Sequence, residues 1–308
     1  MGYSAETMTF GIEIECLVNK YATLRDGSQV TWLPEGWKSV RDGSLRDTPT
    51  KHATEFVSPV LQGEAGLRQV CEVLTAIKAH GGRVTTRGGI HVHVGFPKNT
   101  KKIQKLINIT ANYEQAIYAS TGTVKRQQSG WCASARTAYR DLNVESDIQA
   151  NGGSTRGDNA DMERVAHNGA RAKFMLLNLS KLTRGTGPTI EFRAFAGTLN
   201  ATKLTAHITT CLGIAERALS GAAVRFEGHQ PMSKKKYRVE DGGEGCYEVE
   251  RMMANLGWTT AKRAYGIIEG DGIPSMQARI TELRRLAKKY DADPRFNGYA
   301  PRRYASHY

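Results

Sequence analysis

The segment TFGIEIECLV, residues Thr9–Val18, decides the fold that we expect for this chain. Its apolar residues fall at every second position, which is the pattern of a β-strand with one face in a hydrophobic core. Glu13 and Glu15 then project from the opposite face, roughly 7 Å apart. Two carboxylates this close repel each other unless a cation lies between them. Because a partly solvated strand can also carry Glu on its outer face, the pattern alone leaves both interpretations open.

A second predicted strand, IHVHVG at residues 90–95, alternates in the same way. Its apolar residues face the core, and His91 and His93 share the other face. Two imidazoles at strand spacing can both contact a metal ion or a phosphate. The alternative is a pair of surface histidines on an edge strand, because two histidines do not specify a metal by themselves.

Two more predicted strands add acidic and basic side chains. In TIEFRAF, residues 189–195, Glu191 and Arg193 share one face. In EFVSPV, residues 55–60, Glu55 is expected near the boundary of the core. An acid and a base two residues apart on a strand also form structural ion pairs. With the first two strands, however, these carboxylates and imidazoles match the ligands that Mg²⁺ and Mn²⁺ accept.

Helical periodicity predicts five helices, at residues 64–80, 101–119, 200–220, 247–256 and 274–290. In the last of them, Ile280 and Leu283 are expected to face inward and Arg279 outward. The Gly- and Asn-rich segment 142–167 is interpreted as a long loop that could serve as a lid. The composition changes after Gly221, which predicts a catalytic domain at 1–220 and a basic, mainly helical extension at 221–308.

The composition is that of a globular protein with excess positive charge. The 308 residues include 43 Lys and Arg against 30 Asp and Glu, a formal net charge of +13. This excess favours anionic partners such as nucleotides, nucleic acid or acidic polymers. Five widely spaced cysteines without a CxxC favour neither a disulfide framework nor a zinc site. No apolar run has the length of a membrane span and no signal pattern begins the chain, so we expect a cytoplasmic protein without a membrane partner.

Six short motifs occur in a fixed order: FGIEIE at 10–15, VRDGSL at 40–45, EFVSPVL at 55–61, GGIHVHVG at 88–95, LLNLSKL at 176–182 and TIEFRAFAGTLNATKL at 189–204. Together they resemble the amidoligase family, carboxylate–amine ligases related to glutamine synthetase and glutamate–cysteine ligase. The resemblance covers residues 9–220. It implies an α+β fold with a glutamine-synthetase-like, mostly antiparallel sheet flanked by helices. No GxxxxGK[ST] sequence is present, which excludes a P-loop in its usual form.

The resemblance also implies a set of ligands for metal ions and ATP. Two or more Mg²⁺ or Mn²⁺ ions would be bound by five side chains: Glu13, Glu15, Glu55, His91 and Glu191. His93 would contact the nucleotide phosphates, and Arg193 would contact both the nucleotide and the phosphoryl group in transfer, with Glu55 also in the catalytic set.

Two further positions follow from the same resemblance. Where relatives often carry Arg-Tyr before the LNL motif, this chain has Lys173-Phe174. Lys173 would keep the positive charge next to the nucleotide but lacks the planar fork of arginine. Asp42 occupies the position of the aspartate in the DGS motif.

The implied reaction has two steps. ATP phosphorylates a carboxylate to give an acyl phosphate, and an amine then attacks it to form an amide. Acid and amine could be free small molecules or groups on a macromolecule, and the sequence does not define the oligomeric state. Two alternatives stay open: a basic nucleic-acid-binding protein on a ligase-like scaffold, and a metal-dependent hydrolase of amides or phosphates that uses the same acids.

Overall fold

The structure is a computed structural model that describes residues 2–22, 30–135, 174–183, 186–221, 242–259 and 263–299. Within them a sheet has the strand order β2-β3-β1-β5-β7-β6, and β4 pairs with β1. Every pairing between these strands is antiparallel. The strands are β1 (Thr9–Asn19), β2 (Lys38–Arg41), β3 (Lys51–Val57), β4 (Leu61–Gln62), β5 (Gly89–Gly95), β6 (Leu177–Asn178) and β7 (Thr189–Ala196). The predicted α+β class with a mostly antiparallel sheet is confirmed.

The helices lie where the periodicity of the sequence predicts them. The five long ones are α1 (Gly63–Ala79), α2 (Thr100–Ala119), α7 (Ala201–Ser220), α8 (Glu244–Asn255) and α9 (Met276–Asp291); shorter turns are η1 (Lys20–Ala22) and α6 (Ser180–Thr183). Asn99 and Asn200 cap α2 and α7: their side chains accept hydrogen bonds from the amides of Lys102 and Lys203.

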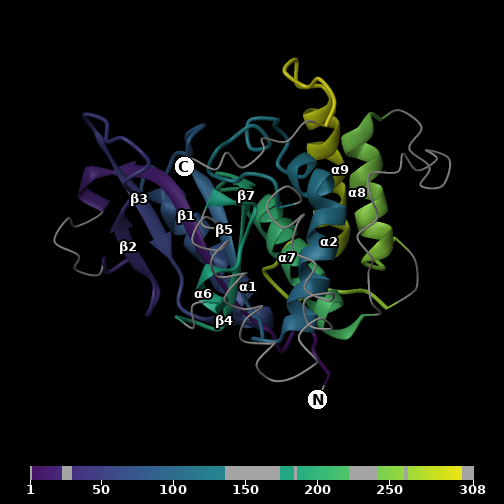
Figure 1. Cartoon of the computed structure of the whole chain (residues 1–308). Coiled ribbons are helices and arrows are strands. Elements are labelled where there is room, and N and C mark those ends of the chain that lie inside the picture. The colour runs from purple at the N-terminus through teal and green to yellow at the C-terminus, as the bar shows by residue number, and fades with distance from the viewer. Residues whose placement is uncertain are drawn as a thin grey trace.

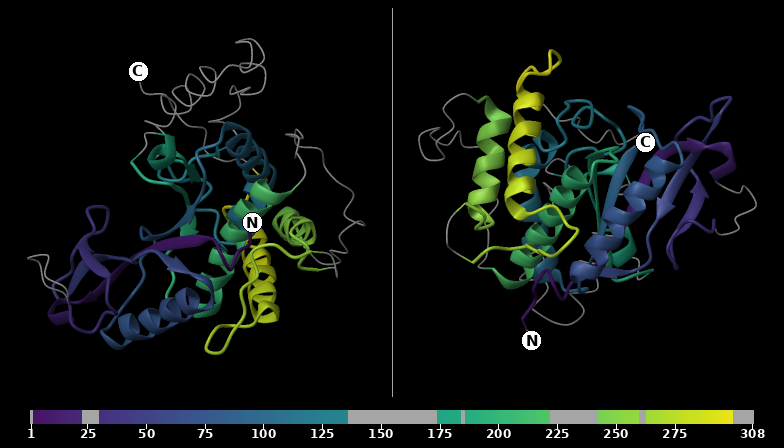
Figure 2. Two further views of the ribbon diagram at one scale, coloured as in Figure 1. Left: turned by 90° about the horizontal axis from the view of Figure 1, so that it is seen from below. Right: turned by 180° about the vertical axis from the view of Figure 1, so that it is seen from behind.

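One hydrophobic core joins the sheet to the helices. Ile12, Ile14 and Val18 of β1 are fully buried, together with Leu67 and Leu74 of α1. Helices α1 and α7 contact each other and lie against this face of the sheet (Figures 1 and 2). The opposite face of β1 carries Glu13 and Glu15, so the alternation read from the sequence separates the core from the site.

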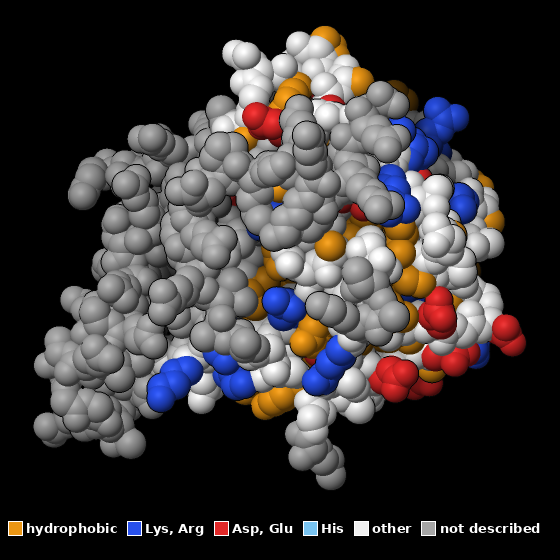
Figure 3. Space-filling view, turned by 90° about the vertical axis from the view of Figure 1, so that its right-hand side faces the viewer, with side chains coloured by type: hydrophobic (Ala, Val, Ile, Leu, Met, Phe, Trp, Pro, Cys, Tyr) orange, Lys and Arg blue, Asp and Glu red, His pale blue; other side chains and the backbone are white. Residues whose placement is uncertain are grey.

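The C-terminal helices pack directly on the rest of the molecule. Helix α8 contacts α2 and α9, and α9 contacts α7 (Figure 1). The division of the chain into domains 1–220 and 221–308 stays a prediction. Figure 3 shows the face beside α8 and α9, where Lys and Arg side chains of the described residues are interspersed with Asp and Glu.

Arg279 of α9 corrects one expectation. The helical periodicity predicts that it faces solvent, but it is completely buried. Its guanidinium donates to the carbonyl oxygens of Pro274 and Ile268, at 2.9 and 2.8 Å, and to Thr209 Oγ1 of α7 at 2.9 Å. The arginine therefore links the segment before α9 to α7, because one buried guanidinium has its donors satisfied by oxygens of both.

No helix among the described residues is long and apolar enough to cross a membrane.

Candidate metal and phosphate site

The register of the antiparallel strands gathers the predicted residues on the face of the sheet opposite α1. Glu13 of β1 lies opposite His91 of β5, and Glu15 lies opposite Glu55 of β3. Likewise, His93 lies opposite Glu191 of β7. Directly opposed residues have Cβ atoms about 5 Å apart. Seven predicted side chains from four strands therefore form one cluster, which we call the carboxylate–histidine cluster: Glu13, Glu15, Glu55, His91, His93, Glu191 and Arg193.

Glu13 is at the centre of this cluster. Its Oε2 lies 2.8 Å from His91 Nδ1, and its Oε1 lies 2.9 Å from His93 Nε2. Burial by itself would raise the pKa of Glu13, but the hydrogen bonds and charges of the two imidazoles hold that pKa well below its usual range. Glu13 is thus ionised and oriented by both histidines.

The pKa of Glu55 shifts in the opposite direction. Burial, reinforced by the negative charges of Glu13, Glu15 and Asp42, raises the pKa of Glu55 to about 8. Carboxylates this close cannot all ionise without a cation among them. A divalent ion would relieve this repulsion, because its charge is the largest in such a site and reverses the local preference for protonation.

The outer carboxylates are also fixed in place. Glu15 Oε2 accepts a hydrogen bond from the Gly89 amide at 2.6 Å, and Glu15 Oε1 lies 3.6 Å from His91 Nε2. Glu191 Oε2 accepts from Asn178 Nδ2 of β6 at 2.6 Å, and its Oε1 pairs with Arg193. Asn178 is not among the predicted site residues, although a polar side chain inside the apolar run LLNLSKL is a signal for it.

Two sets of three side chains could each hold a cation. Glu13, Glu55 and His91 form one triad, and Glu13, His93 and Glu191 form the other; within each, one ligand atom per residue lies within 4.8 Å of the rest. The triads share Glu13, so its two oxygens could bridge two ions. Carboxylate oxygens with one imidazole fit hard divalent cations such as Mg²⁺ or Mn²⁺. His93, expected at the phosphates, thus lies among the candidate metal ligands.

A β-bulge places Arg193 beside the cluster. The register between β5 and β7 shifts between Ile90 and Val92, so two residues of β7, Arg193 and Ala194, lie opposite His91. Bulges re-aim side chains and are frequent near active sites. In the described part of the chain, Arg193 Nε is buried without a hydrogen-bond partner. This N–H is therefore a donor that a ligand could use.

Arg126 supports the bulge through its backbone. This residue, in the loop after α2, is 7% exposed. Its Nε donates to the carbonyl of Ala194 at 3.1 Å, and its Nη2 donates to the carbonyl of Arg193 at 2.5 Å. In the sequence Arg126 is one of many basic residues, and nothing in its local pattern indicates that it is buried against a strand.

The remaining predicted positions divide into two groups. Asp42 begins the turn after β2, where its Oδ1 accepts from the Ser44 amide at 2.5 Å. Lys173, the candidate lid at 142–167 and Lys234–Lys236 lie outside the described residues, so their predicted roles stay predictions.

Comparisons with known proteins identify relatives of this chain. The sequence model of a family described as "Putative amidoligase enzyme" matches residues 6–215. Among solved structures, a bifunctional glutathione synthetase from Pasteurella multocida aligns with 12% sequence identity and a TM-score of 0.41. That alignment covers 92% of this chain and 47% of the synthetase, so the chain spans about half the length of that protein. A search of curated proteins gives no match.

Proposed function

The chain belongs to the amidoligase family, whose model spans residues 6–215, and we propose that it is an ATP-dependent ligase that joins a carboxylate to an amine. The observation that carries the proposal is the pair of triads that share Glu13 next to Arg193. A cluster with this composition suits two divalent cations beside a phosphate, and phosphoryl transfer needs that arrangement of charges.

The cluster suggests which residues would bind metal. Glu13, Glu55 and His91 would hold one Mg²⁺ or Mn²⁺ ion and Glu13, His93 and Glu191 a second, with Glu15 next to His91. Such ions neutralise the negative charge of the phosphates and of the oxygens that enter and leave. The raised pKa of Glu55 agrees with this assignment, because a cation would offset both the burial of its charge and the repulsion from the neighbouring carboxylates.

Arg193 would contact the phosphoryl group as it moves. Glu191 holds the guanidinium in place through Nη1, which leaves the buried Nε to donate to a phosphate oxygen. Positive charge fixed at this position stabilises the transition state more than it stabilises bound ATP. We place Lys173 at the nucleotide as a further positive group, by the family resemblance alone.

The reaction would proceed in two balanced steps. A carboxylate oxygen of the acid attacks the γ-phosphorus of ATP, the bond to the β-phosphate oxygen breaks, and ADP leaves. The nitrogen of the amine then attacks the acyl carbon, phosphate leaves, and the nitrogen loses a proton. Segment 142–167 would have to exclude water from the acyl phosphate, which would otherwise hydrolyse.

The basic surface and the cellular location complete the proposal. With a net charge of +13, the chain could hold an acid or amine that is carried on a macromolecule, nucleic acid included. The five cysteines are free thiols, which suits a reducing cytoplasm where ATP is available.

The test is a screen for ADP release. Full-length protein is incubated with ATP, Mg²⁺ or Mn²⁺, and pairs of acids and amines that include amino acids, polyamines and peptides. A ligase releases ADP in repeated turnovers only when acid, amine and metal are all present, because without the amine the reaction stops at the acyl phosphate. Mass spectrometry detects the amide. Hydrolysis of an amide or phosphate ester without ATP would instead support the hydrolase. Glu72→Gln, an exposed substitution on α1, controls for nonspecific effects in Glu13→Gln.

A further inference from the structure

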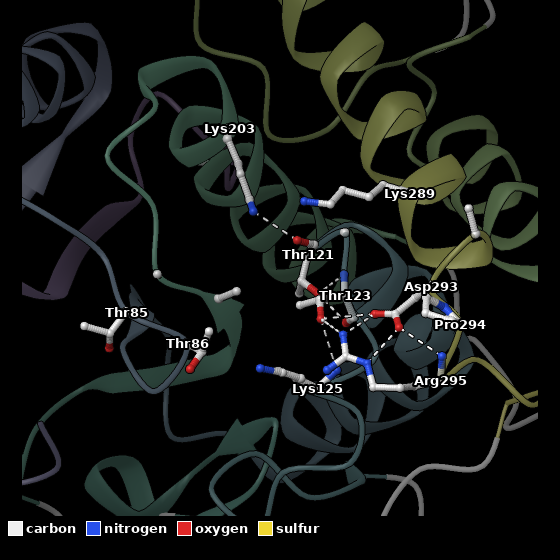
Figure 4. A pocket seen from close by; sticks show the side chains of 14 residues that line it. Thr85, Thr86, Thr121, Thr123, Lys125, Lys203, Lys289, Asp293, Pro294 and Arg295 are labelled. Atoms are coloured by element: carbon white, nitrogen blue, oxygen red, sulfur yellow. Dashed lines mark hydrogen bonds and ion pairs between the residues drawn. The ribbon is translucent and has the colours of Figure 1, made fainter.

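A cleft of about 620 Å³ lies where the matched family region meets the C-terminal helices (Figure 4). Its walls come from five segments: the turn before β5, the loop after α2, the end of β7, the N-terminal end of α7 and the C-terminal end of α9 with the residues after it. We call it the lysine cleft, after Lys125, Lys203 and Lys289. None of the seven residues of the carboxylate–histidine cluster lines it.

The charge of this cleft is strongly positive. Lys125, Lys203, Lys289 and Arg295 line it against one acid, Asp293, so four positive charges and one negative leave +3. Arg295 binds Asp293, with Nε 2.8 Å from Oδ1. In the described part of the chain no ion pair joins any of the three lysines to a carboxylate. Figure 4 shows Lys203 and Lys289 extending toward each other above Thr121.

Lys203 occupies a position that is unfavourable for a cation. It lies in the first turn of α7, where its amide donates to the capping Asn200 Oδ1 at 2.9 Å. The positive end of the helix dipole repels an ammonium at this point. Burial, with the nearby charges of Lys289 and Arg285, lowers the pKa of Lys203 to about 8 despite the attraction of Glu282. Its Nζ donates to the carbonyl of Thr121 at 2.9 Å, which is a neutral acceptor and does not neutralise the ammonium charge.

Hydroxyl groups surround these cations. Thr85 and Thr86 line one wall, and Thr121 and Thr123 line another (Figure 4). The hydroxyl of Thr121 donates to the Tyr118 carbonyl, and that of Thr123 donates to Asp293. The ammonium groups and the hydroxyls of Thr85 and Thr86 therefore supply the donors for phosphate or carboxylate oxygens. Positively charged side chains with neutral donors at their edge have the composition of an anion site. A bound anion would offset the repulsion among the lysines and the repulsion of Lys203 by the dipole of α7.

We propose that the lysine cleft binds a multiply charged anion, of the phosphorylated or polycarboxylate class. The cleft starts where β5 begins and β7 ends, because Ala196, which lines it, pairs with Gly89, and Gly89 lies two residues before His91. The anion would therefore lie beside the carboxylate–histidine cluster. Lys289 and Arg295 lie outside residues 6–215, so the C-terminal helices complete a site that the matched region only begins. This inference concerns binding and does not require the ligase activity.

The experiment measures anion binding directly. Isothermal titration calorimetry at low ionic strength is performed on the full chain, treated with a chelating resin to remove metal, with tripolyphosphate and, separately, citrate. Lys289→Gln and Lys203→Met should each weaken binding about 10-fold or more, the loss of a charge-assisted contact. Lys288→Gln, an exposed neighbour on α9 that does not line the cleft, should leave binding unchanged.

The outcomes separate the sources of the anion and the role of Lys203. Binding of tripolyphosphate alone identifies a phosphate ligand, and binding of citrate as well identifies the wider polyanion class; both support the proposal. A wild-type chain that binds neither anion overturns it, as does an equal effect of Lys289→Gln and Lys288→Gln. Should Lys203 be only structural, Lys203→Met would lower the melting temperature and leave anion binding intact. We expect the reverse, since the methionine removes a half-buried charge.

Discussion

The carboxylate–histidine cluster and the lysine cleft are neighbouring regions with opposite charge and different construction. The cluster is built from alternating positions of regular strands, so its residues recur at every second position in the sequence. The cleft is built from loops and helix ends that are far apart in the chain, Thr85 and Arg295 among them. Both crowd like charges together. In this chain the charged residues on strands could therefore be grouped from the sequence, whereas those gathered from loops and helix ends could not.

The largest effect is expected at Glu13, because it belongs to both triads. Glu13→Gln keeps the shape of the side chain but removes the charge, so ADP release should fall about 10³-fold, the upper end for loss of one electrostatic group. The same variant should lose the rise in melting temperature that Mn²⁺ gives the wild type, because binding to the folded state alone produces that rise.

Glu191→Gln sharpens this prediction because Glu191 belongs to one triad only. It should retain part of the Mn²⁺-dependent rise in melting temperature, while Glu72→Gln on α1 should retain all of it. A Glu13→Gln protein that keeps both its ADP release and its response to Mn²⁺ would show that the cluster does not bind metal.

The next effect is on stability and concerns Arg126, which contacts the backbone at Arg193 and directly follows Lys125 of the cleft. Arg126→Met leaves the carbonyls of Arg193 and Ala194 without their charged donor, so the free energy of unfolding should fall by about 3 kcal/mol. Urea denaturation measures this change, with Arg87→Met, an exposed substitution, as the matched control. Equal stability of the two variants would mean that the bulge holds its shape without Arg126.

Much of the fold and the cluster follows from sequence for a clear physical reason. Alternation along β1 and β5 assigns each side chain to a face, and the apolar face must be buried. Glu13, His91 and Glu191 can therefore be placed on one common face from the order of their residues alone. The five long helices follow from their apolar periodicity, with ends within three residues of those predicted.

What sequence cannot show depends on contacts between distant segments. The bulge at Arg193 arises from the register of β5 against β7, which no single strand encodes. Three polar residues are buried because a distant segment supplies their hydrogen-bond partners: Asn178, Arg126 and Arg279. A pattern of 3.6 residues places Arg279 near the edge of a helix face, but only the fold provides the three oxygens that its guanidinium satisfies.

A smaller effect, on rate alone, is expected at Arg193. Arg193→Lys keeps the positive charge but loses the planar fork, so kcat should fall about 10²-fold with a smaller change in the KM for ATP. The melting temperature should stay near that of the wild type, because the pair with Glu191 can persist as an ammonium–carboxylate pair. Rate and melting temperature are measured on one preparation. A variant with normal kcat would reduce Arg193 to a structural partner of Glu191.

The smallest effect concerns His207 of α7, which contacts both β7 and the residue that follows α2. Its ring stacks on Phe195 of β7 at 4.1 Å between centroids, and its Nε2 lies 3.0 Å from the carbonyl of Ser120, next to the cleft. Burial, with the charge of Lys203, lowers the pKa of His207 to about 3. The folded chain therefore keeps this histidine neutral at pH values where the unfolded chain, with a pKa of about 6.5, binds a proton.

The sign of the pH dependence follows from that difference. The stability that His207 contributes is complete above pH 6.5 and declines as the pH falls toward 3, because protons then favour the unfolded chain. Between pH 6.5 and pH 5 the loss should be about 2 kcal/mol, at about 1.4 kcal/mol per pH unit. His207→Gln keeps a donor for the Ser120 carbonyl and cannot titrate, so the difference in unfolding free energy between the two proteins should shrink by that amount over this range. If the difference is constant with pH, His207 takes up a proton as readily in the folded chain as in the unfolded chain, and burial does not lower its pKa.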